Sequence, residues 1–199
     1  MPEFISKEEL EKIKSFQGEE RGLAIRGEAE YVLSARGKEG LQKLKERMEE
    51  LDCPINYQEL KPFGFYPAYY EILTTLVLDR VFNFKDEEFR KLGRFEAKLP
   101  FMIRGFLKFF GSIEMVAARA SDLWKNFFTF GKLTVEKFSK EERFAVMIIE
   151  NFYHYPKYCR TLEGFIASMM ELIVKNEVAC RKIECPHQGG NHHKFKIEW

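Results

Sequence analysis

Two cysteines and a histidine near the carboxyl-terminal end have side chains that bind metal ions. Cys159 begins an apolar helical pattern, Cys185 ends a strand-like run, and His193 opens another run beyond the turn 186–191. Thiolate and imidazole are the ligands that zinc takes in tetrahedral protein sites. Because a hairpin turn places the ends of its strands side by side, Cys185 and His193 can converge with Cys159 on one point. These three residues could therefore hold a zinc ion.

The same residues also fit an interpretation without metal. Cysteine is among the residue types most often buried, so Cys159 could simply be a small side chain of the core. A structural zinc site has four protein ligands. His187 and His192 in the turn are both candidates for the fourth, and an open fourth position could equally hold water.

The elements that must position these residues follow a long helical region. Ser6 and Glu9 form a capping box, which predicts a short helix from Lys7. Gly37 breaks the next helical pattern, and Pro100 should kink or split a later one. The predicted helices cover residues 7–16, 28–36, the segment between Gly37 and Pro54, 67–82, 86–111 and 113–128.

The rest of the chain has the composition of two β-hairpins. Its predicted strands, rich in β-branched and aromatic residues, are residues 132–138, 143–151, 177–185 and 193–199. Pro156 opens the helix between the two hairpins, and His193 and Phe195 share one face of the last strand by alternation. We therefore predict an α+β fold: N-terminal helices, then a four-stranded antiparallel sheet built as hairpin, helix, hairpin.

Composition and charge exclude several classes of partner. The chain has 199 residues, 45% of them hydrophobic, and balances 32 basic against 31 acidic residues. Nucleic-acid binding normally requires a basic excess, so no such partner is expected. There is no run of about 18 apolar residues and no signal peptide, so we expect no membrane association and a cytoplasmic location. Residues 26–199 are predicted to form one domain, preceded by a helical arm over residues 1–25.

The end of the chain resembles the end of the 4-vinyl-reductase-type domains. Those domains finish with a cysteine, a glycine-containing turn, a second cysteine, one spacer and an aromatic strand. Here Cys185 matches the first cysteine, His193 the second and Phe195 the aromatic residue, with Gly189 or Gly190 in the turn. The likeness is most specific from about residue 120 onward.

Upstream residues resemble a related bacterial family, first described as paralogues in myxobacteria. Its members have a Trp-x-x-aromatic-aromatic-x-x-Gly segment, then a cysteine followed by glycine on a helix. Trp124 and Gly131 match the first feature, and Cys159 and Gly164 match the second. With weaker matches at Tyr66-Pro67, the likeness spans about residues 26–199.

The wider superfamily includes heme-based nitric-oxide sensors, phenol-sensing input domains of transcription activators, and eukaryotic vesicle-tethering subunits. In the phenol-sensing branch, zinc is held by a helix cysteine, two hairpin cysteines and a carboxylate three residues before the first of these. The resemblance therefore places Cys159, Cys185 and His193 on the metal, but Lys182 stands at the carboxylate position. This departure leaves His187 or another group as the fourth ligand, or a site that has decayed. The resemblance also implies a homodimer.

The sequence argues against heme and against enzyme activity. The nitric-oxide sensors hold heme propionates with a Tyr-x-Ser-x-Arg signature, but the nearest string here, residues 31–36, has one residue too many and lies too early. His154 could be an axial ligand, although a histidine among aromatic residues is more often structural. No dinucleotide-binding, phosphate-binding or hydrolase motif is present. Glu163 and Glu171 are interpreted as surface charges.

Aromatic residues predicted to lie between helices and sheet could line an apolar pocket. In the related domains this layer encloses an apolar ligand, although each phenylalanine could equally fill a core. The candidates for ligand contact are Phe110, Trp124, Phe128, Phe138 and Phe165.

These observations favour a non-enzymatic sensor domain that binds a hydrophobic small molecule. Zinc would fix its last hairpin to the helix of Cys159, and a downstream protein partner would receive the signal. The alternative is a scaffold of the vesicle-tethering type, whose cavity is permanently filled. A heme-based gas sensor and an accessory factor for tetrapyrrole vinyl reduction are further alternatives, the latter suggested by the family name alone.

Overall fold

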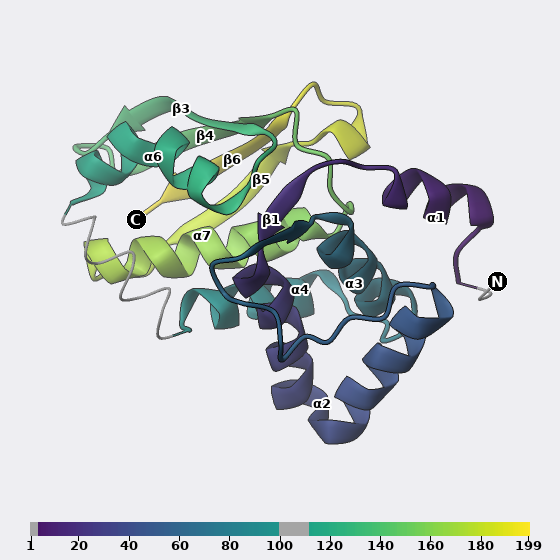
Figure 1. Cartoon of the computed structure of the whole chain (residues 1–199). Helices are drawn as coiled ribbons and strands as arrows, with labels where there is room; N and C mark the ends of the chain where they lie inside the picture. Colours follow the sequence, from purple (N-terminus) through teal and green to yellow (C-terminus); the bar gives the residue numbers. More distant parts are fainter. Residues whose placement is uncertain (1–3, 100–111) are drawn as a thin grey trace. The chain divides into compact units, whose positions relative to one another are not determined.

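The computed structural model describes residues 4–99 and 112–199 (Figure 1). The chain divides into two compact units, residues 1–85 and 86–199. Among these described residues, no helix is long and apolar enough to cross a membrane. The predicted arm, residues 1–25, belongs to the first unit. Its Leu10 and Ile13 are buried there, and the Glu9 carboxylate pairs with Arg80 at 2.7 Å. The predicted extent of the family-like domain, residues 26–199, stays a prediction.

The first unit combines helices with a small two-stranded sheet. Its elements in the described residues are α1 (Lys7–Lys14), β1 (Glu19–Arg21), α2 (Gly22–Glu50), β2 (Phe65–Pro67) and α3 (Tyr69–Arg80). The Ser6 side chain caps α1 by accepting a hydrogen bond from the Glu9 backbone at 3.1 Å, as the capping box predicts. Gly37 breaks α2 at a φ of 69°, a conformation that glycine adopts readily, so the predicted break is confirmed.

The second unit contains the predicted hairpins and the helix between them. Its elements in the described residues are α4 (Asp86–Ala97), α6 (Ile113–Phe127), β3 (Lys132–Ser139), β4 (Phe144–Glu150), α7 (Tyr158–Val174), β5 (Ala179–Glu184), the 3₁₀ turn η1 (Pro186–Gln188) and β6 (His193–Glu198). The predicted α+β fold class is confirmed. Pro100, the predicted kink, lies outside the described residues.

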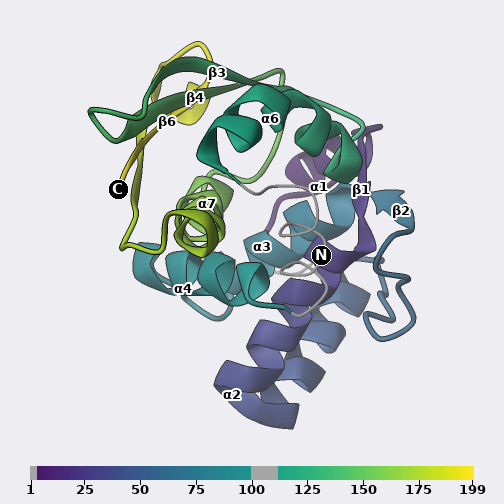
Figure 2. The ribbon, with the colours of Figure 1, turned by 90° about the vertical axis from the view of Figure 1, so that its left-hand side faces the viewer.

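The four strands form one antiparallel sheet in the order β3-β4-β6-β5. The register pairs Ile149 with His193 and Met147 with Phe195. His193 and Phe195 are buried, whereas Lys194 between them is only partly covered, so the predicted alternation is confirmed. Figure 2 shows α6 and α7 on the same side of this sheet, and residues of both helices share a core with its covered face.

The backbones of helices α4 and α7 lie in close contact. A Cβ atom added to Gly93 would lie 1.9 Å from the Thr161 carbonyl oxygen, and one added to Gly164 would lie 2.0 Å from the Arg90 carbonyl oxygen. Only glycine permits this approach, because backbone atoms cannot move aside as the tip of a side chain can. The second unit therefore has three layers, in the order sheet, α7 and α4 (Figure 2).

Candidate metal centre

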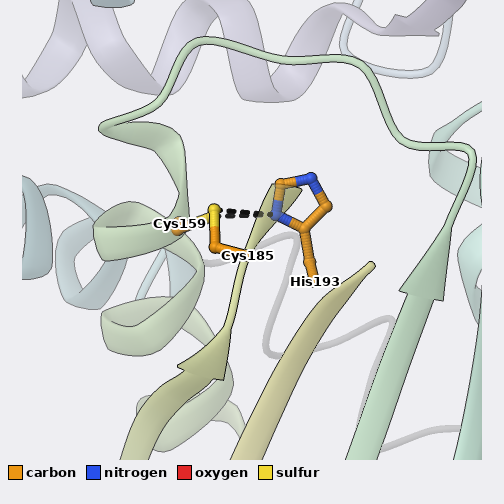
Figure 3. A group of neighbouring side chains, drawn as sticks. All are labelled: Cys159, Cys185 and His193. Atoms are coloured by element: carbon orange, nitrogen blue, oxygen red, sulfur yellow. Dashed lines mark hydrogen bonds between the residues drawn. The ribbon is translucent and has the colours of Figure 1, made fainter. Parts of the chain in front are cut away.

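Cys159, Cys185 and His193 meet between α7 and the last hairpin (Figure 3). Cys159 is the second residue of α7, Cys185 follows β5, and His193 is the first residue of β6. The turn between the strands folds back on itself, since the backbone N–H groups of Gln188 and Gly190 both donate to the Cys185 carbonyl at 2.9 and 3.0 Å. The structure thus brings together the three residues that the sequence nominated.

The three ligand atoms are spaced as a tetrahedral zinc site requires. The Cys159 and Cys185 sulfurs are 3.9 Å apart, and the His193 Nδ1 atom lies 3.1 and 3.7 Å from them. Zinc bonds of about 2.3 Å to sulfur and about 2.0 Å to nitrogen, at tetrahedral angles, separate two sulfurs by about 3.8 Å and sulfur from nitrogen by about 3.5 Å. All three side chains are buried. One ion could therefore bind all three atoms after small shifts.

The hydrogen bonding of His193 leaves the correct nitrogen for a metal. Its Nε2 atom lies 3.1 Å from the Phe152 carbonyl oxygen, which can only accept, so Nε2 carries the proton and donates. Burial lowers the pKa of His193 to about 4, so the ring is neutral at physiological pH. Nδ1 therefore directs a lone pair at the two sulfurs. Metal-binding histidines commonly have such a second hydrogen bond.

The Cys159 thiol is protonated when no cation is present. Burial raises the pKa of the Cys159 thiol, and the neighbouring Cys185 raises it further. A divalent cation would displace this proton and could bind the two sulfurs as thiolates beside the neutral imidazole. The donor set is therefore the one that zinc prefers, and the protein supplies it without a buried negative charge once the metal is bound.

Acid should destabilise the metal-free protein through His193. Its folded pKa of about 4 lies below the unfolded value of 6.5, so between these values only the unfolded state binds the proton. The contribution of His193 to stability is thus complete above about pH 6.5 and falls by about 3 kcal/mol toward pH 4. Urea unfolding of chelator-treated protein across this range measures it. His193→Gln should flatten the profile, and an unchanged profile in that variant would contradict the prediction.

His187, the predicted fourth ligand, lies beside the cluster rather than in it. It is in the exposed turn η1, its ring centroid is 5.8 Å from that of His193, and its ring donates to the His154 backbone carbonyl. His192, the other candidate, has its Nε2 atom 3.7 Å from a Glu184 carboxylate oxygen. The described residues thus supply three converging ligand atoms here, and the fourth ligand stays a prediction.

The prediction of a surface charge is wrong for Glu163. This residue of α7 is only 3% exposed. Its carboxylate accepts hydrogen bonds from Arg90 Nε at 2.8 Å, Arg160 Nη1 at 2.7 Å and the Lys182 backbone N–H at 2.7 Å. The signal available in the sequence was its position one turn after Cys159, on the apolar face of the same helix.

The five aromatic residues predicted to contact a ligand lie in different surroundings. Trp124 and Phe128 are buried and stack on each other with centroids 4.4 Å apart. Phe138 is 36% exposed and stacks on Trp199, and Phe165 is half-buried. Phe110 lies outside the described residues. Of the four candidates among the described residues, Trp124 and Phe128 lie together.

A separate open groove of about 760 Å³ lies along α4, α7 and β5. Its lining is dominated by charged side chains, and none of the five aromatic candidates contributes to it. Several of its arginines are paired, Arg94 with Glu171 at 3.0 Å and Arg90 with Glu163 at 2.8 Å. The groove therefore does not have the apolar lining that the predicted ligand requires.

Comparison with known proteins identifies the fold. No family model and no curated protein matches the chain. Among solved structures, the H-NOX protein from Shewanella oneidensis in the Fe(II)NO state has a TM-score of 0.67 at 12% identity, covering 89% of this chain and 98% of that one. The unliganded Fe(II) H-NOX protein from K. algicida has a TM-score of 0.62 at 14% identity, covering 89% and 95%.

A third match is more distant. Trafficking protein particle complex subunit 3 from Naegleria fowleri, covalently bound to palmitic acid, has a TM-score of 0.48 at 16% identity, covering 62% of this chain and 88% of that one. This match is too weak to support an argument, and all of these identities are low enough that the likeness concerns the fold alone. The narrower family suggested by the sequence stays a prediction. The chain has the fold of the H-NOX domains.

Proposed function

We propose that this chain is a non-enzymatic sensor domain in which a zinc ion fixes the last hairpin to α7. The ion would be held by Cys159, Cys185 and His193. The observation that supports this proposal most is the spacing of their ligand atoms, 3.1 to 3.9 Å, together with the unprotonated Nδ1 atom of His193, which faces both sulfurs. The H-NOX fold supports a role in binding small molecules, since the Shewanella protein was solved in its Fe(II)NO state.

Zinc in this setting would be structural. It has no redox chemistry of its own, and a closed site with four protein ligands leaves no position for a substrate. His187 is the fourth ligand of the proposal: one ring nitrogen donates to the His154 backbone carbonyl, and the other would bind the metal. We further propose that an apolar small molecule binds this domain, that the chain forms a homodimer, and that a protein partner receives the signal.

Zinc is a better candidate than heme for this chain. Of its four histidines, three lie in or beside the last hairpin, and the fourth is His154. The His154 Nδ1 atom accepts a hydrogen bond from the Tyr155 backbone at 2.8 Å, and its ring stacks on Tyr158 with centroids 3.6 Å apart. These contacts support a structural role for His154, which the sequence favoured.

Native mass spectrometry of untagged protein tests the proposal. We expect one zinc ion per chain, lost in Cys185→Ser and kept in Cys180→Ser, whose thiol is buried in the same unit outside the cluster. An additional organic mass that is lost on denaturation would define the class of ligand. A protein that stays metal-free after incubation with zinc would refute the metal part of the proposal.

The second candidate, a scaffold with a filled interior, is favoured by one observation. Phe152 packs against Phe130 with parallel rings 5.3 Å apart and against Trp124 and Phe128 edge to face. These aromatic side chains thus fill space beneath the sheet by contacting one another. A protein that carries zinc but neither retains nor takes up an apolar fluorescent probe would favour the scaffold over the sensor.

A further inference from the structure

The carboxylate of Glu163 joins three segments of the second unit. Arg90 comes from α4, Arg160 from α7 itself, and the third donor is the backbone N–H of Lys182 in β5. All three distances are 2.7 or 2.8 Å, and the carboxylate is buried. Charge-assisted hydrogen bonds of this length are the strong ones, and they fix the positions of their partners.

Two of the joined segments carry the metal ligands. Glu163 lies one helical turn beyond Cys159 on α7, and Lys182 lies three residues before Cys185. The Glu163 carboxylate therefore connects the backbones that carry the two sulfurs, whose separation is 3.9 Å. A shift of α7 along β5 would change that separation directly.

The sheet alone does not fix the segment that leads to Cys185. The pairing of β5 with β6 has an irregularity between Lys182 and Glu184, and Ile183 at this point is 54% exposed. A bulge of this kind interrupts the ladder and lets the strand bend. The hydrogen bond from Lys182 to Glu163 lies immediately before the irregularity, where it can determine the direction of the chain toward Cys185.

We infer that Glu163 is a positioning residue for the metal centre. It sets the spacing of the Cys159 and Cys185 sulfurs, and through Arg90 it makes zinc affinity depend on the placement of α4. This inference rests on the proposed zinc site and specifies how that site is regulated. Any event that displaces α4 would break the hydrogen bond between Arg90 and Glu163 and lower the affinity for zinc. Glu163 itself does not contact the ligand atoms.

Zinc affinity of Glu163→Gln, measured by competition with a chromophoric chelator, tests this inference. The amide cannot accept from two guanidinium groups and a backbone N–H as the carboxylate does. We expect zinc to bind about 10- to 100-fold more weakly, the range found when residues that orient metal ligands are replaced. Cobalt(II) substituted for zinc should show a changed thiolate-to-metal absorption band.

Glu171→Gln is the matched control. Glu171 also lies on α7, pairs with Arg94 of α4 at 3.0 Å, and accepts from the Val178 backbone at 3.5 Å, but it is three helical turns from Cys159. A structural role alone predicts similar stability losses and no change of metal affinity in both variants. We expect the affinity and the cobalt spectrum to change only in Glu163→Gln.

Zinc binding by the wild type tests the proposed metal site, and zinc binding by Glu163→Gln tests the role of Glu163. Wild-type protein that binds neither zinc nor cobalt refutes the proposed site, whereas a wild type that binds zinc and a Glu163→Gln variant of equal affinity refute the inference. If Glu163→Gln does not fold, Arg90→Gln is measured in its place. This variant loses the hydrogen bond from Arg90 of α4 and leaves the Glu163 carboxylate with its other two donors. Unchanged zinc affinity in that variant would overturn the dependence on α4.

Discussion

Cys159→Ser is expected to release the zinc ion and to lower the free energy of unfolding by about 4 kcal/mol in the presence of zinc. The hydroxyl of serine is a poor zinc ligand, and His193 and Cys185 alone cannot fix the hairpin to α7. Zinc held by these ligands binds the folded state alone, so its binding free energy adds to the free energy of unfolding. Loss of zinc binding therefore lowers stability by the same amount. Urea unfolding with added zinc, compared with unfolding in chelator, measures the effect.

Cys180→Ser provides the control for this prediction. Cys180 is also a buried thiol of the second unit, on β5, but it does not belong to the ligand cluster. Replacing an ordinary core thiol should cost about 1 kcal/mol, and the cost should be the same with zinc or with chelator. Equal and zinc-independent losses in the two variants would show that Cys159 is a core residue and nothing more.

Gly164→Ala is expected to lower stability by about 3 kcal/mol even without metal. The added methyl group would lie 2.0 Å from the Arg90 carbonyl oxygen, and α4 and α7 would have to separate to admit it. Backbone atoms of two packed helices cannot yield as a flexible side chain does. Because Glu163 precedes Gly164, the separation should also weaken zinc binding. Denaturant unfolding of chelator-treated protein measures the first effect.

Gly189→Asn is the matched control for Gly164→Ala. Gly189 has a φ of 84° in the turn η1–β6, and a Cβ added there would meet nothing within 4 Å. Asparagine tolerates this left-handed conformation better than most residues, so the loss should stay below about 1 kcal/mol. If Gly164→Ala were as mild as this control, the close approach of α4 and α7 would not exist in solution.

Features that depend on neighbouring residues could be predicted from the sequence. The capping of α1 by Ser6 is decided within one turn of helix. The burial of His193 and Phe195 follows from strand alternation. Cys185 and His193 were predictable as neighbours because a single hairpin turn connects them, and Cys159 because the helix between two hairpins of one sheet must cross the sheet's face.

Features that depend on distant segments could not be predicted. The position of Glu163 on the apolar face of its helix indicates burial, but the partners of its carboxylate, Arg90 of α4 and Lys182 of β5, lie in distant segments. The close approach at Gly93 and Gly164 has no local signature, because each glycine is required by the backbone of the other helix, although Gly164 also matches the motif of the related bacterial family. The order of strands was also undetermined, since two hairpins can join along either edge.

That order makes the folding of the second unit strongly nonlocal. β6 is the last strand in the sequence, yet it lies inside the sheet between β4 and β5. The pairing of Ile149 with His193 closes a loop of more than forty residues, which contains α7 and β5. Loop-closure entropy makes such pairings slow to form. The first hairpin, β3 with β4, should therefore nucleate early, and docking of β6 should limit the rate at which the native sheet is completed.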